Sequence, residues 1–183
     1  MKRLIYIVAI FIGFSFLSSC LKDNFDEYEE WRNSNDRWLA EQELRKNPDG
    51  SPYYEKIVPA WNPNAYVLMH WYNDRNATAS NLSPLSTSYT DIKYKLSDFE
   101  GLAKDSSYLR TNPADSIYRS KVNSNIEGWV IGVTNMHVGD SVTMIVPYQY
   151  AYGAKGQSTV KPYSVLVFDL KLKGIPGYEI PVN

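Results

Sequence analysis

The sequence predicts an α+β fold in which an antiparallel β-sheet carries one short α-helix and follows a helical N-terminal extension. Three observations support this prediction. Aromatic residues recur at helical spacing up to the stop "NPDG" at 47–50. From residue 53 onwards, β-branched and aromatic residues instead form strand-like stretches. One short helical turn, at about 124–136, interrupts the later strands.

The composition fits one ordinary domain with extensions and excludes several functions. The chain has 183 residues, a net charge of −1, 44% hydrophobic residues and 21% charged residues, which suits a globular domain. The balanced charge provides no field that would attract nucleic acid. The only histidines, His70 and His137, form no metal-spaced cluster, and no nucleophile or phosphate-loop motif is present. We therefore expect no metal and no cofactor.

Residues 1–20 are typical of a signal peptide. Lys2 and Arg3 precede an apolar run, residues 4–17, that is shorter than the roughly 20 residues needed to span a bilayer. The run ends in "LSSC", which resembles the lipobox of bacterial lipoproteins and implies lipidation of Cys20. An ordinary secretory signal with an incidental cysteine is the alternative. Because Cys20 is the only cysteine, the rest of the chain contains no disulfide.

The lipobox implies a protein of the cell envelope, anchored by its lipid to the periplasmic or surface face of an outer membrane. An acidic cluster that begins at Asp23 is similar to the export signal of some lipoproteins of the Bacteroidetes type.

Residues 21–50 are expected to form a tether and an N-terminal helix from about 25 to 45. Aromatic residues lie near one another on its helical wheel, namely Phe25, Tyr28, Trp31 and Trp38. This stripe has two interpretations. The helix is either a separable stalk, through which a homodimer could form, or an element that packs its aromatic stripe on the domain.

We assign residues 51–175 to one domain and residues 176–183 to a C-terminal tail. Strands are predicted at 53–61, 65–72, 87–96, 117–122 and 163–175, and a turn followed by a strand is predicted at 139–153. A polar loop is expected at 73–86 and a loop-rich stretch at 97–116. Ser124 or Asn125 is the candidate N-cap of the short helix.

The later segments resemble a known family. "IEGWVIGVTNMHVGDSVTMIVPYQYAYGAKG" at 126–156 and "YSVLVFDLKL" at 163–172 are similar to the C-terminal half of FKBP-type peptidyl-prolyl isomerases. A Gly-Trp pair, M-x-V-G, P-x-x-x-A-Y-G, a flap loop and L-V-F-D-V-E-L occur in that order in the family. "DIKYKLSDFEGLAKDSS" at 91–107 is similar to a further family motif. The resemblance covers about 87–173 and implies a twisted antiparallel sheet wrapped across one short α-helix, with an aromatic pocket between them.

The resemblance also implies the site residues. Trp129 corresponds to the pocket floor, Ile126 to the residue whose backbone N–H binds the substrate carbonyl, and Tyr152 to a hydroxyl donor at the rim. The residues implied to be catalytic are Tyr94, Asp105, Ile126, Trp129, Tyr152 and Phe168. Those implied to bind substrate are Tyr118, Gln157 and, on the flap, Val160 or Thr159.

The implied function is a peptidyl-prolyl cis–trans isomerase or folding helper that acts on proline-containing polypeptides without a cofactor. Three residues depart from the family pattern. Lys104 and Ser116 stand where aromatic pocket residues are usual, and Gln157 stands where a histidine is common. These departures predict a pocket that lacks part of one wall. They favour an alternative function, a non-catalytic FKBP-like module that binds a peptide or a partner protein.

Overall fold

The computed structural model describes residues 27–177, so the predicted signal peptide, Cys20 and most of the predicted tail lie outside the described residues. In this part of the chain, no helix is long and apolar enough to cross a bilayer. The elements follow one another as α3 (Glu29–Leu44), β1 (Glu55–Ile57), β2 (Val67–Trp71), α4 (Arg75–Thr78), β3 (Tyr89–Asp98), β4 (Ala103–Ser106), β5 (Tyr118–Lys121), η1 (Val122–Ser124), α5 (Glu127–Val133), β6 (Ser141–Val146), η2 (Tyr148–Tyr150) and β7 (Leu166–Gly174).

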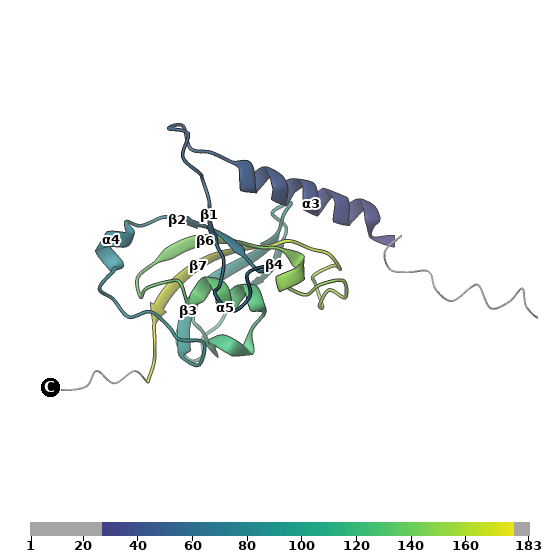
Figure 1. The fold of residues 1–183 in the computed structure, drawn as a ribbon. Helices are drawn as coiled ribbons and strands as arrows, with labels where there is room; N and C mark the ends of the chain where they lie inside the picture. The colour runs from purple at the N-terminus through teal and green to yellow at the C-terminus, as the bar shows by residue number, and fades with distance from the viewer. Residues whose placement is uncertain (1–26, 178–183) are drawn as a thin grey trace, which may run out of the picture.

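One antiparallel sheet organises the molecule (Figure 1). Its seven strands run in the order β1-β2-β6-β7-β3-β4, and β5 pairs with the other end of β3. The longest pairing joins β3 to β7, from Asp91↔Gly174 to Asp98↔Leu166. This arrangement confirms the predicted α+β class with an antiparallel sheet.

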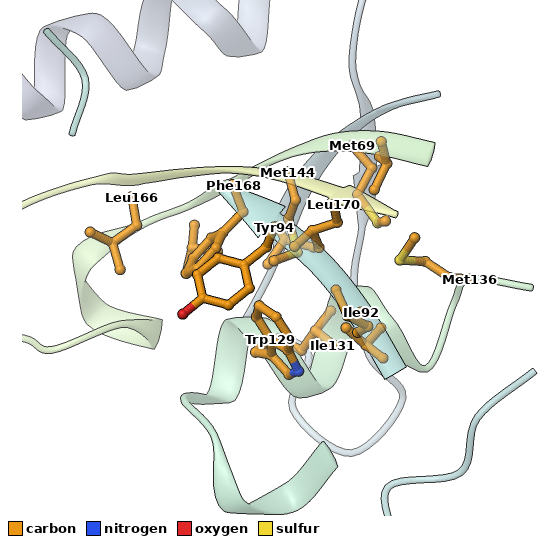
Figure 2. Packing of buried hydrophobic residues seen from close by; sticks show 14 of the residues in the cluster. Met69, Ile92, Tyr94, Trp129, Ile131, Met136, Met144, Leu166, Phe168 and Leu170 are labelled. Carbon is orange, nitrogen blue, oxygen red and sulfur yellow. The ribbon is translucent and has the colours of Figure 1, made fainter. Parts of the chain in front are cut away.

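The main core lies between the sheet and α5. Figure 2 shows Trp129 and Ile131 of this helix pointing towards sheet residues that include Tyr94 and Phe168. Two glycines let the helix approach closely. A Cβ atom at Gly128 would overlap Val146, and one at Gly132 would overlap the sulfur of Met144. The sequence "EGWVIGV" therefore builds a short helix with a nearly flat side against the sheet.

A second, smaller core lies on the opposite face of the sheet, under α3. Leu39 of this helix packs with Leu68, Ile145 and Val165. Because both faces are covered, β6 is buried at every position from Val142 to Val146, and it does not show the alternation of a half-exposed strand. Figure 1 shows α3 and α5 on opposite sides of the sheet.

The structure thus favours packing over separation for the N-terminal helix. The ring of Phe99, just after β3, lies 5.0 Å from that of Trp31 and 6.1 Å from that of Trp38. Trp31 and Trp38 of the aromatic stripe therefore pack on the domain. The described helix spans Glu29–Leu44, within the predicted limits of 25 and 45.

Several local predictions were wrong. Neither Ser124 nor Asn125 caps α5, because Ser124 lies in the 3-10 turn η1 and the N-cap is Ile126. The Asn125 amide instead donates to the carbonyls of the preceding turn. The predicted strand at 139–153 ends at Val146, and η2 follows it. The predicted loops at 73–86 and 97–116 contain α4 and β4.

Candidate active site

A cavity of about 400 Å³ opens between α5, β3, β7 and the loops around them. Its lining residues come from segments far apart in the sequence: Tyr94, Leu96, Asp105, Arg110, Tyr118, Ser124, Asn125, Ile126, Trp129, Tyr152, Gln157 and Phe168. All six residues predicted to be catalytic are in this set, as are Tyr118 and Gln157 from the predicted substrate-binding group. The structure therefore brings most of the predicted site together in one place.

Aromatic rings form the floor and walls of the cavity. Trp129 is 3% exposed and lies edge-on to Tyr94, Tyr118 and Phe168, at centroid distances of 5.8, 5.9 and 5.5 Å. Figure 2 shows the rings of Tyr94, Phe168 and Trp129 converging from β3, β7 and α5. Edge-to-face contacts of this kind hold each ring in a fixed orientation. The result is a rigid apolar basin.

A polar side faces this basin. The Tyr94 hydroxyl donates to Asp105 Oδ2, and Arg110 Nη2 donates to the Tyr94 hydroxyl oxygen at 3.4 Å. The Arg110 guanidinium also lies 5.0 Å from the centroid of the Tyr118 ring. Burial, together with the hydrogen bond to Asp105, raises the pKa of Tyr94 well above its usual value. Tyr94 is therefore a neutral, fixed part of the wall.

One side-chain contact and one backbone N–H complete the entrance to the cavity near the start of α5. The Tyr118 hydroxyl donates to Asn125 Oδ1 at 2.9 Å, which fixes the loop that precedes the helix. Ile126 is the N-cap of α5, and its backbone N–H donates to no acceptor among the described residues. This N–H is thus available to a ligand carbonyl at the edge of the aromatic basin.

The three tyrosines of "YQYAY" take different positions. Tyr148 is buried, and its ring lies 5.4 Å from that of Tyr163. The Tyr150 hydroxyl donates to the carbonyl of Asn64. Tyr152 alone lines the cavity, and burial raises the pKa of its hydroxyl. Because Tyr148–Tyr150 form the 3-10 turn η2 and not part of a strand, the three tyrosine side chains do not share one face.

We define the flap as residues 153–163, between Tyr152 and β7. Gln157 of the flap lines the cavity, whereas Thr159 and Val160 are not among its lining residues. Thr159 Oγ1 donates to the Lys104 carbonyl, and Val160 is buried in the main core. The Gln157–Val160 backbone pair turns the tip of the flap back on itself, which directs Val160 inwards.

Two of the three residues that depart from the family pattern lie outside the cavity lining. Lys104 does not line the cavity, because its ammonium pairs with Asp98 at 2.8 Å and its side chain is only 7% exposed. Ser116 is buried, with a positive φ of 60°, and is likewise absent from the lining. Tyr118, two residues on, provides the aromatic ring on that side.

Sequence reasoning missed four lining residues: Leu96, Arg110, Ser124 and Asn125. Leu96 could have been found, because it follows Tyr94 by two and therefore shares its face of β3. Arg110 gave no periodic signal, since it lies in an irregular loop whose path only the fold reveals.

The arrangement can bind a compact apolar group and orient a neighbouring carbonyl. The described residues contain no cluster of His, Cys, Asp and Glu able to hold a metal ion. The lining offers hydroxyl, amide and guanidinium donors around a ring-sized basin. Such a site favours non-covalent recognition of a polypeptide segment.

Comparisons with known proteins relate part of this chain to one family of enzymes. The model of a family described as FKBP-type peptidyl-prolyl cis-trans isomerase matches residues 83–173. FK506-binding protein 2 of Aspergillus oryzae is 35% identical over 80 residues, which are 43% of this chain and 57% of that protein. FkpA of Escherichia coli, named an FKBP-type peptidyl-prolyl cis-trans isomerase, is 30% identical over 90 residues, or 49% and 32% of the two chains.

Solved structures show the same fold. A crystal structure of a peptidyl-prolyl cis-trans isomerase from Pseudomonas syringae aligns with a TM-score of 0.60 and 20% identity, over 81% of this chain and 95% of the other. The crystal structure of FkpA from Escherichia coli aligns with a TM-score of 0.64 and 19% identity, over 82% and 63%. In the sequence comparisons, the chain covers 57% of the length of FK506-binding protein 2 and 32% of the length of FkpA.

Proposed function

We propose that this protein isomerises Xaa–Pro bonds in proline-containing polypeptides. The premise is that residues 83–173 form a domain of the FKBP-type peptidyl-prolyl cis-trans isomerase family. The observation that carries the proposal is the aromatic basin around Trp129, with the unengaged N–H of Ile126 at its edge. The basin fits a prolyl ring, and the N–H fits the carbonyl beside that ring.

The reaction asks for little beyond such a pocket. Rotation about a peptide bond meets a barrier of about 18–20 kcal/mol, because the planar amide is stabilised by resonance. The twisted amide has lost this resonance and much of its dipole. A dry, apolar site therefore disfavours the planar form relative to the twisted one.

Each lining group has a proposed role in this differential binding. Trp129 supports the prolyl ring from below, between Tyr94 and Phe168. The Ile126 N–H and the Tyr152 hydroxyl donate to the substrate and hold it in the reactive orientation. Asp105 and Arg110 keep the Tyr94 ring in place through its hydroxyl.

The test is an isomerisation assay on proline-containing peptides, with the full chain in detergent. Wild type should accelerate the exchange above background. Trp129→Leu should lower kcat/KM by roughly tenfold or more, because it removes the flat support under the ring. Trp61→Leu is the matched control, since Trp61 is 60% exposed and lies outside the cavity.

The binding-module alternative predicts a different result. If wild type shows no exchange above background, while peptide binding still depends on Trp129, the isomerase proposal is wrong. The protein is then a peptide-binding module that uses the same basin. Circular dichroism on every variant checks that the fold is intact.

We further propose that Cys20 carries the lipid that anchors this domain in the cell envelope. The support is the "LSSC" sequence after a signal-length apolar run. Cys20→Ala should release the protein from the membrane fraction. Full membrane retention of this variant, with normal removal of the signal, would contradict the anchor.

The homodimer predicted for the N-terminal helix needs a different face from the aromatic stripe. The outer side of α3 carries mainly charged and polar residues, namely Glu29, Glu30, Asn33, Asp36 and Arg37. A dimer through α3 would therefore depend on salt, and sedimentation velocity at low and high ionic strength tests it.

A further inference from the structure

Asn35 occupies an unusual position for a polar side chain. It lies on the inner face of α3, and none of its surface is exposed. Its Oδ1 accepts from the backbone N–H of Val165 at 2.7 Å, and its Nδ2 donates to the Trp31 carbonyl at 2.8 Å. Burying an amide costs free energy unless its hydrogen bonds are formed. If this position were needed only for packing, an apolar residue would be more favourable. The amide provides a directional link between α3 and the start of β7.

A second link from the same helix ends on the neighbouring residue. Trp31 Nε1 donates to Ser164 Oγ at 3.1 Å, and Ser164 Oγ donates in turn to the Lys161 carbonyl at 2.8 Å. The Lys161 ammonium lies 4.3 Å from the centroid of the Trp31 ring. Consecutive turns of α3 therefore hold Ser164 and Val165, the two residues that follow the flap.

The flap carries this restraint to the cavity. The Tyr163 N–H donates to the Gly153 carbonyl at 2.9 Å, which ties the two ends of the flap together. The Gly156 N–H donates to the Tyr152 carbonyl at 3.2 Å. Tyr152 and Gln157, on either side of these bonds, line the cavity. These hydrogen bonds, together with the short stretch of backbone between residues 161 and 165, connect α3 with the rim.

We propose that α3 is part of the site's framework and that Asn35 is a positioning residue, which acts with Trp31 to fix the flap and so the places of Tyr152 and Gln157. The N-terminal extension then controls how well the rim meets a substrate, although it contributes no lining residue. The catalytic consequence rests on the proposed isomerase function. The structural consequence, a flap that opens more often when the link is cut, does not.

The test compares two substitutions in α3, with the full chain in detergent. Asn35→Ala cuts the link to Val165. Leu39→Ala weakens the same helix–sheet contact one turn further on, where Leu39 packs with Leu68, Ile145 and Val165 but its side chain makes no hydrogen bond, so the Asn35–Val165 bond is kept. Hydrogen–deuterium exchange is followed by mass spectrometry in the flap and in the β3–β7 pair. Isomerisation kinetics are measured where both variants remain folded.

In Asn35→Ala, exchange in the flap should rise about tenfold relative to β3–β7, because local opening no longer has to break the Val165 bond. Leu39→Ala should raise exchange in both segments together. The KM of Asn35→Ala should rise several-fold, because small misplacements of positioning groups are costly. Asn35→Asp, which keeps the acceptor for Val165, should restore flap protection in part.

Equal exchange in the flap for Asn35→Ala and Leu39→Ala would overturn the inference, because α3 would then act only through overall stability. If the flap exchange follows the expectation while wild type shows no isomerase activity, the positioning role stands and the proposed function falls. If wild type is active and Asn35→Ala opens the flap without changing KM or kcat, the flap does not govern the site and the catalytic part of the inference is wrong.

Discussion

The ammonium of Lys104 lies 2.8 Å from the carboxylate of Asp98, and both side chains are almost completely buried, with 7% and 1% of their surfaces exposed. Asp98 also accepts backbone hydrogen bonds from Glu100 and Leu102, so it organises the turn between β3 and β4. Lys104 neutralises the buried charge of that turn. The departure from the family pattern at this position therefore has a structural explanation at the edge of the sheet.

Removal of Lys104 should leave the Asp98 charge buried without its partner. Breaking a buried ion pair from one side costs about 3–5 kcal/mol. Because two backbone N–H groups still stabilise the Asp98 carboxylate, we expect Lys104→Met to cost about 3 kcal/mol, the lower end of this range. Urea denaturation measures the free energy of unfolding. The control is Lys173→Met, at an exposed position of β7. A loss below about 1 kcal/mol for Lys104→Met would contradict this account, and Asp98→Asn in the same chain should recover part of the loss.

The sheet could be predicted from local patterns, whereas most of the cavity residues were implied by the resemblance to a known family. Alternation indicated β3 and β7, and β-branched and aromatic residues indicated β2. The short helical turn at about 124–136 contains the helix that carries Trp129. The residues that resemble family motifs lie at the strand ends and helix start that border the cavity.

Long-range polar contacts could not be predicted in the same way. Asn35 gave no signal, because its partner Val165 is 130 residues away and a single asparagine does not alter the helical pattern. The Lys104–Asp98 pair is close in sequence, but it forms only when β4 folds back on β3, and the sequence pattern did not show which side of that turn Lys104 would face. The turn of the flap between Gln157 and Val160, which directs Val160 inwards, was likewise not visible in the sequence.

Gly128 and Gly132 should resist enlargement even though both lie in a helix. Replacing an exposed helical glycine by alanine usually gains about 1 kcal/mol. Here the added Cβ would overlap Val146 at Gly128 and the Met144 sulfur at Gly132. Overpacking of this kind typically costs ~1–3 kcal/mol, so Gly128→Ala should be destabilising on balance.

The two glycines should also differ from each other. Met144 is flexible and its sulfur can move, whereas Val146 is stiff and the Tyr150 carbonyl lies 3.2 Å from the added atom at Gly128. Gly128→Ala should therefore lower the thermal midpoint more than Gly132→Ala. Gly174→Ala, where the added atom meets nothing within 4 Å, is the control. Equal midpoints for all three variants would show that α5 can shift away from the sheet.

Asp140 should make the fold sensitive to acid. Its carboxylate is buried and accepts hydrogen bonds from Asn73 at 2.9 Å, Thr78 at 2.5 Å and the His137 N–H at 2.8 Å. Burial opposes ionisation, but these bonds and the charge of Arg75 outweigh it and hold the pKa of Asp140 below its usual value of 3.8.

The sign of the pH effect follows from this lowered pKa. The stability that ionised Asp140 contributes is fully present above about pH 4 and is lost as the pH falls through the folded-state pKa. Asp140→Asn should cost ~2 kcal/mol at pH 7, and the difference from wild type should shrink in the acid range. Urea denaturation at pH 7 and pH 3 measures both values. A difference that is the same at both pH values would argue against a role for the charge.

Tyr152 should act through its hydroxyl, and its contribution should not depend on pH near neutrality. Tyr152→Phe removes one donor and little volume, so the fold should survive. A net hydrogen bond is worth ~0.5–1.5 kcal/mol, which corresponds to a loss of up to about tenfold in kcat/KM. Tyr72→Phe is the matched control, since Tyr72 is exposed and donates to or accepts from Thr143, outside the cavity.

Burial raises the pKa of Tyr152, so the hydroxyl remains a donor at every pH below about 10. Burial raises the pKa of Tyr94 as well, and this wall of the cavity also keeps its proton. Since proton transfer has no part in the proposed mechanism, kcat/KM of wild type should be flat from about pH 6 to pH 9. A bell-shaped profile in this range would show that a titrating group takes part in the reaction, and the non-covalent mechanism would then have to be replaced by acid–base catalysis.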